Sequence, residues 1–442
     1  MTLRLPVPAG PHLVLGLARS GRAAALALAA RGEPVIAVDA SEPDVTALRA
    51  AGIETHTGSD GLAQLPRARS VIKSPGVPDE AALVVAARAA GIPVMGELEL
   101  AWRLLENEFV AVTGTNGKTT TVEWIGHVHR EAALPVAVAG NVGTALSTLV
   151  GQVSPSATVV CEASSFQLHD TVAFAPEAGV LLNLTPDHLD RHGTMEAYRD
   201  AKLQIFARQG NDDIAVAPIG LGIEDLGGCA RRVCFGAGGG AELELRAGVL
   251  WWDERALLPA AELSLPGAHN LQNAMATAAV TLARGVDPDA VVAGLRSFAG
   301  VAHRLETVAE RGGVRFVNDS KATNVASTLV ALDALAGAAP RLHLILGGQG
   351  KGQDFGALAA PVGRTCVAVY LIGEAGPLIG QALGASGVPR RACGDLEAAV
   401  AAASAAAQPG QVVLLSPACA SFDQFSDFEA RGERFRELVR EG

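Results

Sequence analysis

Short apolar runs that end in glycine or small polar residues recur along this chain. Phe109–Val112 is one such run, and the sequence G-T-N-G-K-T-T follows it at residues 114–120. Val122–Val128 then resembles the start of a helix. The order strand, glycine turn, helix directs backbone N–H groups and a helix N-terminus toward a phosphate group. The pattern therefore predicts a nucleotide-binding loop between the strand and the helix.

In such a loop Lys118 would reach the outer phosphates of a nucleotide, and the Thr119 hydroxyl would ligate Mg²⁺. The usual P-loop has a glycine five residues before Gly117, where this chain has Val112, so the loop is a shortened variant. The alternative is an ordinary glycine turn with a surface lysine. The strand before the turn and the helix after it favour ATP binding.

The first hundred residues repeat this pattern. A strand at 12–15 precedes Gly16-Leu-Ala-Arg-Ser-Gly21 and an alanine-rich helix, and a second strand at 34–38 ends at Asp39. This is the layout of a dinucleotide-binding fingerprint. Ala18 replaces the middle glycine, however, which favours a Rossmann-like unit without a nicotinamide cofactor. A strand at 70–72 then leads into Lys73-Ser-Pro-Gly76, and we expect a small α/β domain over residues 1–97.

Three further apolar runs, at 136–139, 157–161 and 179–182, end in polar residues that include Asn141, Glu162 and His188. In a parallel sheet these ends lie on the same side as the glycine loop. Oxygen ligands such as the Glu162 carboxylate suit Mg²⁺. A surface or helix-capping carboxylate and a turn histidine are the alternatives. The central pattern ends near residue 299, which predicts a second domain over 98–300.

A helix predicted over 195–206 carries Lys202 among apolar neighbours, where the lysine could simply extend to solvent. After a less informative stretch of short strands, apolar runs at 314–317, 342–346 and 412–415 again lead into small polar loops. They predict a third domain over 301–442 with another open α/β sheet. Within it, Arg304 and Lys321 could neutralise phosphate in a closed cleft, or form surface ion pairs.

Composition narrows the class of protein. The 442 residues carry a net charge of −11, which argues against nucleic acid as a partner. Six scattered cysteines form no CxxC pair, which favours a reducing compartment over a zinc or disulfide framework. The N-terminal stretch lacks the pattern of a signal peptide, and Pro and Gly interrupt the long uncharged stretches. We therefore expect a cytoplasmic protein that does not span a membrane.

Seven motifs of this chain resemble those of a known family. They are G-T-N-G-K-T-T, E-A-S-S-F-Q-L, N-L-T-P-D-H-L-D-R, H-N-x-x-N, H-R, N-D-S-K-A-T-N and S-P-A-C-A-S-F-D-Q-F, in this order. Over essentially its whole length the chain resembles the Mur ligases. The last two motifs resemble those members that add D-glutamate to UDP-N-acetylmuramoyl-L-alanine. The resemblance implies a UDP-binding Rossmann-like domain, a central ATPase domain and a C-terminal Rossmann-like domain.

The implied reaction belongs to peptidoglycan precursor synthesis. ATP phosphorylates the L-alanyl carboxylate, and the amine of D-glutamate attacks the acyl phosphate, which leaves an amide, ADP and phosphate. Because a carboxylate must approach the γ-phosphate, two Mg²⁺ ions and cationic side chains are needed to screen the repulsion. The expected partners are these small-molecule substrates, and the expected assembly is a monomer.

The resemblance also implies roles for individual residues. The implied ATP contacts are Gly114, Thr115, Asn116, Gly117, Lys118, Thr119, Thr120, Asn273, Arg304 and Asp319. The implied Mg²⁺ site comprises Thr119, Glu162, His188 and Lys202, the last as a carbamylated lysine. The implied UDP-substrate contacts are Ser20, Asp39, Ser74, Gly76 and Asn141, and the implied D-glutamate contacts are Lys321, Thr323, Lys351, Ser421, Phe422 and Phe428. The implied catalytic set is Lys118, His188, Lys202 and Lys321. Arg19 and Ala40 depart from the residues expected around uridine.

Two alternatives stay open. The first is a sibling enzyme that adds meso-diaminopimelate, which would carry a D-N-P-R-type motif in its last domain. In that region this chain reads G-G-Q-G-K-G-Q-D-F, which disfavours the sibling enzyme. A binding protein that has lost catalysis would have a damaged site, yet Lys118, Glu162, His188 and Lys202 are all present.

Overall fold

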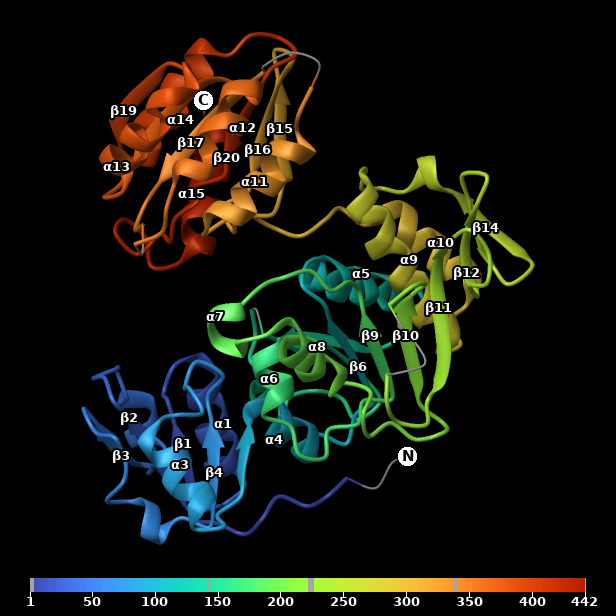
Figure 1. Cartoon of the computed structure of the whole chain (residues 1–442), viewed down its shortest axis with the longest axis vertical. Helices are drawn as coiled ribbons and strands as arrows, with labels where there is room; N and C mark the ends of the chain where they lie inside the picture. The colour runs from blue at the N-terminus through green and yellow to red at the C-terminus, as the bar shows by residue number, and fades with distance from the viewer. Residues whose placement is uncertain (1–3, 142, 222–225, 338–340, 351, 442) are drawn as a thin grey trace. The chain divides into compact units, whose positions relative to one another are not determined.

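The computed structural model describes residues 4–141, 143–221, 226–337, 341–350 and 352–441. The chain folds into two compact units, Met1–Ala299 and Gly300–Gly442. The first unit contains two sheets and the second contains one (Figure 1). Within the described ranges, every helix is too short or too polar to cross a membrane. The three α/β sheets confirm the predicted fold class.

The first sheet is wholly parallel, with strand order β3-β2-β1-β4-β5. Its strands are β1 (His12–Leu15), β2 (Val35–Asp39), β3 (Glu54–Thr57), β4 (Ser70–Lys73) and β5 (Val94–Gly96). Helices of this region are α1 (Arg19–Ala30), α2 (Thr46–Ala50), α3 (Ala82–Ala89) and α4 (Glu97–Leu104). The strand order reverses between β1 and β4, and α/β sheets bind ligands at the carboxyl ends of such a strand pair.

The second sheet has the order β14-β13-β12-β11-β10-β9-β6-β8-β7. Its strands are β6 (Phe109–Thr113), β7 (Val136–Gly140), β8 (Thr158–Glu162), β9 (Ala178–Leu181), β10 (Ile214–Pro218), β11 (Arg231–Ala237), β12 (Leu243–Arg246), β13 (Val249–Trp252) and β14 (Arg255–Pro259). Its helices are α5 (Lys118–Glu131), α6 (Ser165–His169), α7 (Leu189–His192), α8 (Met195–Leu203), α9 (Ala268–Ala283) and α10 (Pro288–Ser297). Because β6 to β9 are parallel, their carboxyl ends share one edge, as the sequence predicted.

Two helix boundaries differ from the sequence prediction. Helix α5 begins at Lys118, four residues before the predicted start, because the left-handed residue Gly117 (φ 85°) caps it. Helix α8 ends at Leu203 and not at 206. The N–H groups of Ile205 and Phe206 bond carbonyls three residues back, which is the tightened geometry of a closing turn.

The sheet of the second unit has the order β15-β16-β20-β17-β18-β19, and only β15 is antiparallel to its neighbour. Its strands are β15 (Glu306–Arg311), β16 (Val314–Asn318), β17 (Leu342–Gly347), β18 (Cys366–Ile372), β19 (Arg390–Gly394) and β20 (Val412–Leu415). Apolar side chains of α11 (Val325–Ala334), α12 (Ala359–Thr365) and α13 (Gly376–Ala382) pack in one core cluster, and those of α14 (Leu396–Ala406) and α15 (Phe428–Glu441) pack in the other. Since β20 lies between β16 and β17, the loops that follow these three strands are neighbours.

Candidate active site

The glycine loop joins α5 to β6, the strand that lies between β9 and β8 in the second sheet. Gly114 and Gly117 both have positive φ, 154° and 85°. A Cβ atom on Gly117 would lie 2.2 Å from the side-chain oxygen of Asn273, so only glycine fits there. Residues 114–120, all predicted to contact ATP, therefore form one loop and helix start, and Asn273 of α9 lies against it.

The end of β9 anchors this loop. The N–H of Thr115 donates to the Asn183 carbonyl (3.1 Å), and the N–H of Asn116 donates to the Asn183 side chain (2.9 Å). The Thr115 hydroxyl lies 3.1 Å from the Tyr198 hydroxyl. Sequence reasoning assigned no role to Asn183 or Tyr198, although the N-L-T-P-D-H motif begins at Asn183. Both residues fix the loop that a phosphate would contact.

Two lysines reach the Gly114 carbonyl. Lys118 Nζ donates to it (2.9 Å) and to the Thr115 carbonyl (2.9 Å), and Lys202 Nζ donates to it from α8 (2.8 Å). Lys202 is 2% exposed, so the alternative in which it extends to solvent is wrong. Burial, together with the charge of Lys118, lowers the pKa of Lys202 to about 7. A fraction of Lys202 is therefore a neutral amine near neutral pH.

Glu162 lies at the end of β8 and is 3% exposed. Its carboxylate accepts hydrogen bonds from the Thr119 hydroxyl (2.7 Å) and from the Asn141 side chain (3.0 Å). A carboxylate and a hydroxyl thus meet at the N-terminus of α5, which is a donor set suited to a hard cation. Three of the residues predicted from different motifs are brought together here.

His188 lies apart from these contacts. It adopts a left-handed conformation (φ 51°), its ring packs edge-on against Phe166 (5.0 Å between ring centres), and its Nε2 is 3.5 Å from an Asp187 carboxylate oxygen. No contact recorded among the described residues joins it to Glu162 or Lys202. The predicted role of His188 at the metal therefore stays a prediction.

A cavity of about 580 Å³ opens at the ends of β1 and β4. We call it the N-terminal cavity. The residues predicted to contact the UDP substrate all line it, namely Ser20, Asp39, Ser74, Gly76 and Asn141. Ala40 and Gln167 line it as well, whereas Arg19 donates to the Gly143 carbonyl (2.8 Å). Residues of the first sheet and its loops, together with Asn141 after β7 and Gln167 of α6, thus form one cavity.

Asp39 is the carboxylate of this cavity. Burial by itself raises its pKa, but the hydrogen bonds that it accepts from the Leu17 N–H (2.6 Å) and from Ser41 outweigh burial and lower it. The side chain is therefore an anion at neutral pH. Such a carboxylate can accept hydrogen bonds from a ligand, for instance from sugar hydroxyls.

In the second unit, Asp319 lies at the end of β16. It accepts hydrogen bonds from the Ser416 hydroxyl (2.7 Å) and the Leu305 N–H (3.2 Å). Burial raises its pKa to about 7, although these bonds and the charge of Arg304 oppose the change. Asp319 and Arg304, both predicted to contact ATP, are therefore neighbours in this unit.

Four of the predicted D-glutamate residues, Lys321, Thr323, Ser421 and Phe422, follow β16 and β20, and Phe428 begins α15. Lys321 Nζ is 5.9 Å from the centre of the Phe428 ring, and the Thr323 N–H donates to the Lys321 carbonyl (2.9 Å). Ser421 is buried, whereas Phe422 is 61% exposed. Lys351, the remaining predicted contact, lies outside the described residues.

A buried arginine that sequence reasoning missed holds these loops together. Arg431 of α15 is 1% exposed and donates to the Ser320 hydroxyl (2.9 Å) and carbonyl (2.9 Å) and to the carbonyls of Cys419 (3.1 Å) and Ala420 (3.3 Å). It thereby joins the N-D-S and S-P-A-C-A-S motifs. Arg431 is one of several charged residues in the last helix, and nothing in the sequence around it indicates that it is buried.

Comparison with known proteins supports one family throughout the chain. Residues 11–96 match the Mur ligase MurD-like N-terminal domain, residues 112–281 the Mur ligase middle domain, and residues 303–419 the Mur ligase glutamate ligase domain. A UDP-N-acetylmuramoylalanine–D-glutamate ligase of Pelotomaculum thermopropionicum is 41% identical over 97% of this chain and 96% of that protein. The ligase of the same name from Anaeromyxobacter dehalogenans is 42% identical over 97% of each chain.

Solved structures share the fold at low identity. UDP-N-acetylmuramate-alanine ligase MurC of Thermotoga maritima has a TM-score of 0.61 and 21% identity over 97% of this chain and 99% of that chain. MurF ligase of the same organism, solved in complex with ADP, has a TM-score of 0.58 and 17% identity over 93% of this chain and 96% of that chain. From the curated relatives and the matched domains together, this chain belongs to the Mur ligase family.

Proposed function

We propose that this chain is an ATP-dependent ligase that joins D-glutamate to UDP-N-acetylmuramoyl-L-alanine in peptidoglycan precursor synthesis. The observation that carries the proposal is the meeting of Lys118, Lys202, Thr119 and Glu162 around the Gly114 loop. Relatives of that name cover nearly the whole chain at 41–42% identity. The roles assigned to residues 1–97, 98–300 and 301–442 are UDP-substrate binding, ATP binding and D-glutamate binding.

The glycine loop supports the ATP part of the proposal. The N-terminus of the 14-residue helix α5 is proposed to form the anion site, while the N–H groups of Thr115 and Asn116 hold the loop to Asn183. Lys118 adds a cation that can leave the loop carbonyls for the β- and γ-phosphates. Asn273 of α9, whose side chain lies against Gly117, is proposed to contact the same nucleotide, and so are Arg304 and Asp319.

Thr119, Glu162 and His188 are the residues that would hold Mg²⁺. Bound there, two Mg²⁺ ions would screen the repulsion between the substrate carboxylate and the γ-phosphate. The fit rests on the Thr119–Glu162 contact (2.7 Å), which gathers hard oxygen atoms at a cationic helix end. Thr119 and Glu162 also fix one another, which keeps both oxygens in place.

Lys202 is proposed to be carbamylated. In this reaction the neutral amine forms a bond to the carbon of CO₂ and releases a proton, which leaves an anionic carbamate. A pKa of about 7 makes the neutral amine available at physiological pH. The new oxygens would then replace a buried cation by an anion beside Glu162, as a metal site requires.

The amide-forming step is part of the same proposal. ATP first phosphorylates the L-alanyl carboxylate, because a free carboxylate is a poor electrophile. The amine of D-glutamate then attacks the acyl phosphate, and phosphate leaves. Lys321, Thr323, Lys351, Ser421, Phe422 and Phe428 are the residues proposed to hold D-glutamate. Two carboxylates on that amino acid explain a pocket that contains lysines and hydroxyl groups.

The test is phosphate release by the purified chain with Mg²⁺, ATP and UDP-N-acetylmuramoyl-L-alanine, with one amino acid added at a time. We expect release only with D-glutamate. Release with a different amino acid would move the assignment to a sibling ligase, and ATP binding without release for any amino acid would favour a binding protein.

Two further experiments test the remaining expectations. Sedimentation of the same sample tests the proposed monomer, and fractionation of cells tests the proposed cytoplasmic location.

A further inference from the structure

One wall of the N-terminal cavity is a single turn. Ser74, Pro75, Gly76, Val77 and Pro78, which follow β4, all line the cavity. Gln167 of α6, the helix that follows β8 of the second sheet, lines the cavity as well. The shape of the cavity therefore depends on how this turn is held and on where α6 lies.

A buried lysine holds the turn from behind. Lys73, the last residue of β4, is 1% exposed, and its Nζ donates to the Val77 carbonyl (3.0 Å). The same Nζ lies 3.0 Å from an Asp170 oxygen and 3.3 Å from an Asp79 oxygen. Asp170 caps the C-terminus of α6 three residues after Gln167, and its side chain is 2% exposed. Lys73 thus connects both walls of the cavity.

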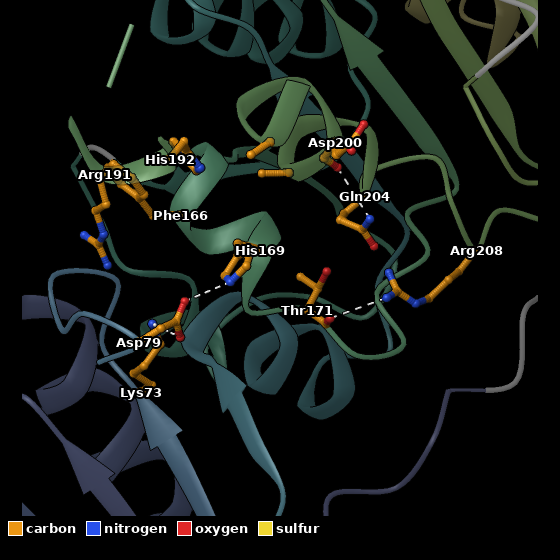
Figure 2. Close-up of a pocket in the computed structure, with 12 residues that line it drawn as sticks. Lys73, Asp79, Phe166, His169, Thr171, Arg191, His192, Asp200, Gln204 and Arg208 are labelled. Carbon is orange, nitrogen blue, oxygen red and sulfur yellow. Dashed lines mark hydrogen bonds and ion pairs between the residues drawn. The ribbon is translucent and has the colours of Figure 1, made fainter. Parts of the chain in front are cut away.

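We define the Lys73 cluster as Lys73, Asp79 and Asp170. Two of its members, Lys73 and Asp79, line a second cavity of about 550 Å³ (Figure 2). Ligand atoms of Asp79, His169 and Asp170 lie within 4.8 Å of one another, a spacing that a metal ion could use. The ammonium of Lys73, however, already lies between the two carboxylates and supplies the cation. Burial raises the pKa of Asp170, and the charge and hydrogen bond of Lys73 oppose that rise, so the lysine favours the ionised carboxylate.

A second cation reaches the same carbonyl. Arg191 Nη2 of α7 donates to the Val77 carbonyl (3.0 Å), and its guanidinium lies over the Phe166 ring (4.2 Å). Figure 2 shows Arg191 beside Phe166, with Lys73 and Asp79 nearby. Arg191 follows His188 by three residues. The turn that lines the cavity is therefore linked to the segment that carries a proposed metal ligand.

We propose that Lys73 is a positioning residue for the UDP-bearing substrate, with Arg191 as a second anchor of the same turn. Lys73 does not line the N-terminal cavity; it acts by fixing the Val77 carbonyl and by joining the turn to α6. Loss of the cluster lets the turn and Gln167 move independently, which weakens substrate binding without changing the ATP loop. This inference rests on the proposed function of the chain.

The experiment compares three variants in the phosphate-release assay. Lys73→Met with Asp170→Asn removes both charges of the closest pair, so that neither is left buried and unpaired. We expect the KM for UDP-N-acetylmuramoyl-L-alanine to rise at least tenfold, with the KM for ATP within twofold. Arg191→Met, an exposed change, is expected to raise the KM for the same substrate about threefold. Arg88→Met is the control, because Arg88 pairs with Asp79 (2.8 Å) but does not reach the Val77 carbonyl.

A stable double variant with an unchanged KM for the UDP substrate would overturn the inference, as would equal changes in the KM for both substrates. Should the double variant fail to fold, Arg191→Met decides, and an unchanged KM in that variant overturns the inference. Titration of wild type with UDP distinguishes failure of the proposed ligase function from failure of the proposed role of Lys73. If wild type releases no phosphate but binds UDP, the proposed function fails, and weaker UDP binding by the variants still tests the role of Lys73.

Discussion

Two buried lysines of the first unit have opposite surroundings. Lys73 ends β4 and has carboxylate oxygens at 3.0 and 3.3 Å. Lys202 of α8 contacts the Gly114 carbonyl and the Tyr198 ring, and no ion pair recorded among the described residues includes it. Burial alone therefore does not determine what a lysine does. Lys73 pairs directly with two carboxylates, whereas burial and the charge of Lys118 lower the pKa of Lys202 to about 7 despite the opposing charges of Asp187 and Glu162.

Breaking the ion pair between Lys73 and Asp170 should change the stability of the chain more than any other substitution considered below. Lys73→Met leaves Asp170 as a buried carboxylate without its cation, which is expected to lower the free energy of unfolding by about 3–5 kcal/mol. Urea denaturation measures this change. Arg88→Met, which removes a half-exposed partner of Asp79, should cost less than about 0.5 kcal/mol. Equal stability of the two variants would contradict the distinction drawn between these cations.

Removal of the Lys202 amine should affect catalysis and not the fold. Lys202→Met is expected to lower kcat by about 10²–10³-fold, because the carbamate proposed to hold the Mg²⁺ that screens the developing charge is lost. Phosphate release under saturating substrates measures it. Glu196→Gln, an exposed change on the same helix, is the matched control and should keep kcat within about twofold. A Lys202→Met variant with the kcat of wild type would refute the assigned role.

The same Lys202→Met variant should be more stable than wild type, in contrast to Lys73→Met. In the folded chain the pKa of Lys202 is about 7, against an ordinary value of 10.5. Between these values the unfolded chain binds a proton that the folded chain does not, so this group makes stability rise with pH. We expect a gain of about 1–3 kcal/mol below pH 7 that declines toward pH 10.5.

Thermal unfolding of wild type and Lys202→Met over pH 6–9 measures that gain. Because kcat falls while the free energy of unfolding rises, this variant would show that Lys202 serves catalysis and lowers stability. A loss of stability at pH 6 comparable with that of Lys73→Met would show that the two lysines do not differ in the proposed way.

The smallest expected effect is the change in the pKa of Lys202 when the Tyr198 ring is removed. Lys202 Nζ lies 4.6 Å from the centre of the Tyr198 ring, and such a contact favours the charged lysine by about 0.5–1 kcal/mol. Tyr198→Leu should therefore lower the pKa of Lys202 by about half a pH unit. The pH midpoint of ¹³CO₂ uptake, followed by NMR of the carbamate carbon, measures it. Tyr198→Phe keeps the ring and should keep the midpoint, and an upward change in Tyr198→Leu would contradict the contact's role.

The sequence by itself determined the repeated unit of the fold. Apolar runs such as Phe109–Val112 and Leu342–Leu346 can only be buried, so they predict central strands of parallel sheets, and both were confirmed. The glycines of the loop after β6 were also readable, because positive φ and close approach demand residues without a Cβ atom. The polar edge strand Glu54–Thr57 was missed, since it has no apolar run.

Tertiary structure alone decided what each polar residue contacts. Lys73 and Asp170 are 97 positions apart, and Lys202 is 88 positions from Gly114, so no local pattern could pair them. From helical spacing Lys202 could have extended to solvent, but in the folded chain it is buried and contacts the Gly114 carbonyl and the Tyr198 ring. The four hydrogen bonds of Arg431 are equally invisible in the sequence. Local sequence decides which backbone forms, whereas charge states depend on burial and partners that only the folded chain brings together.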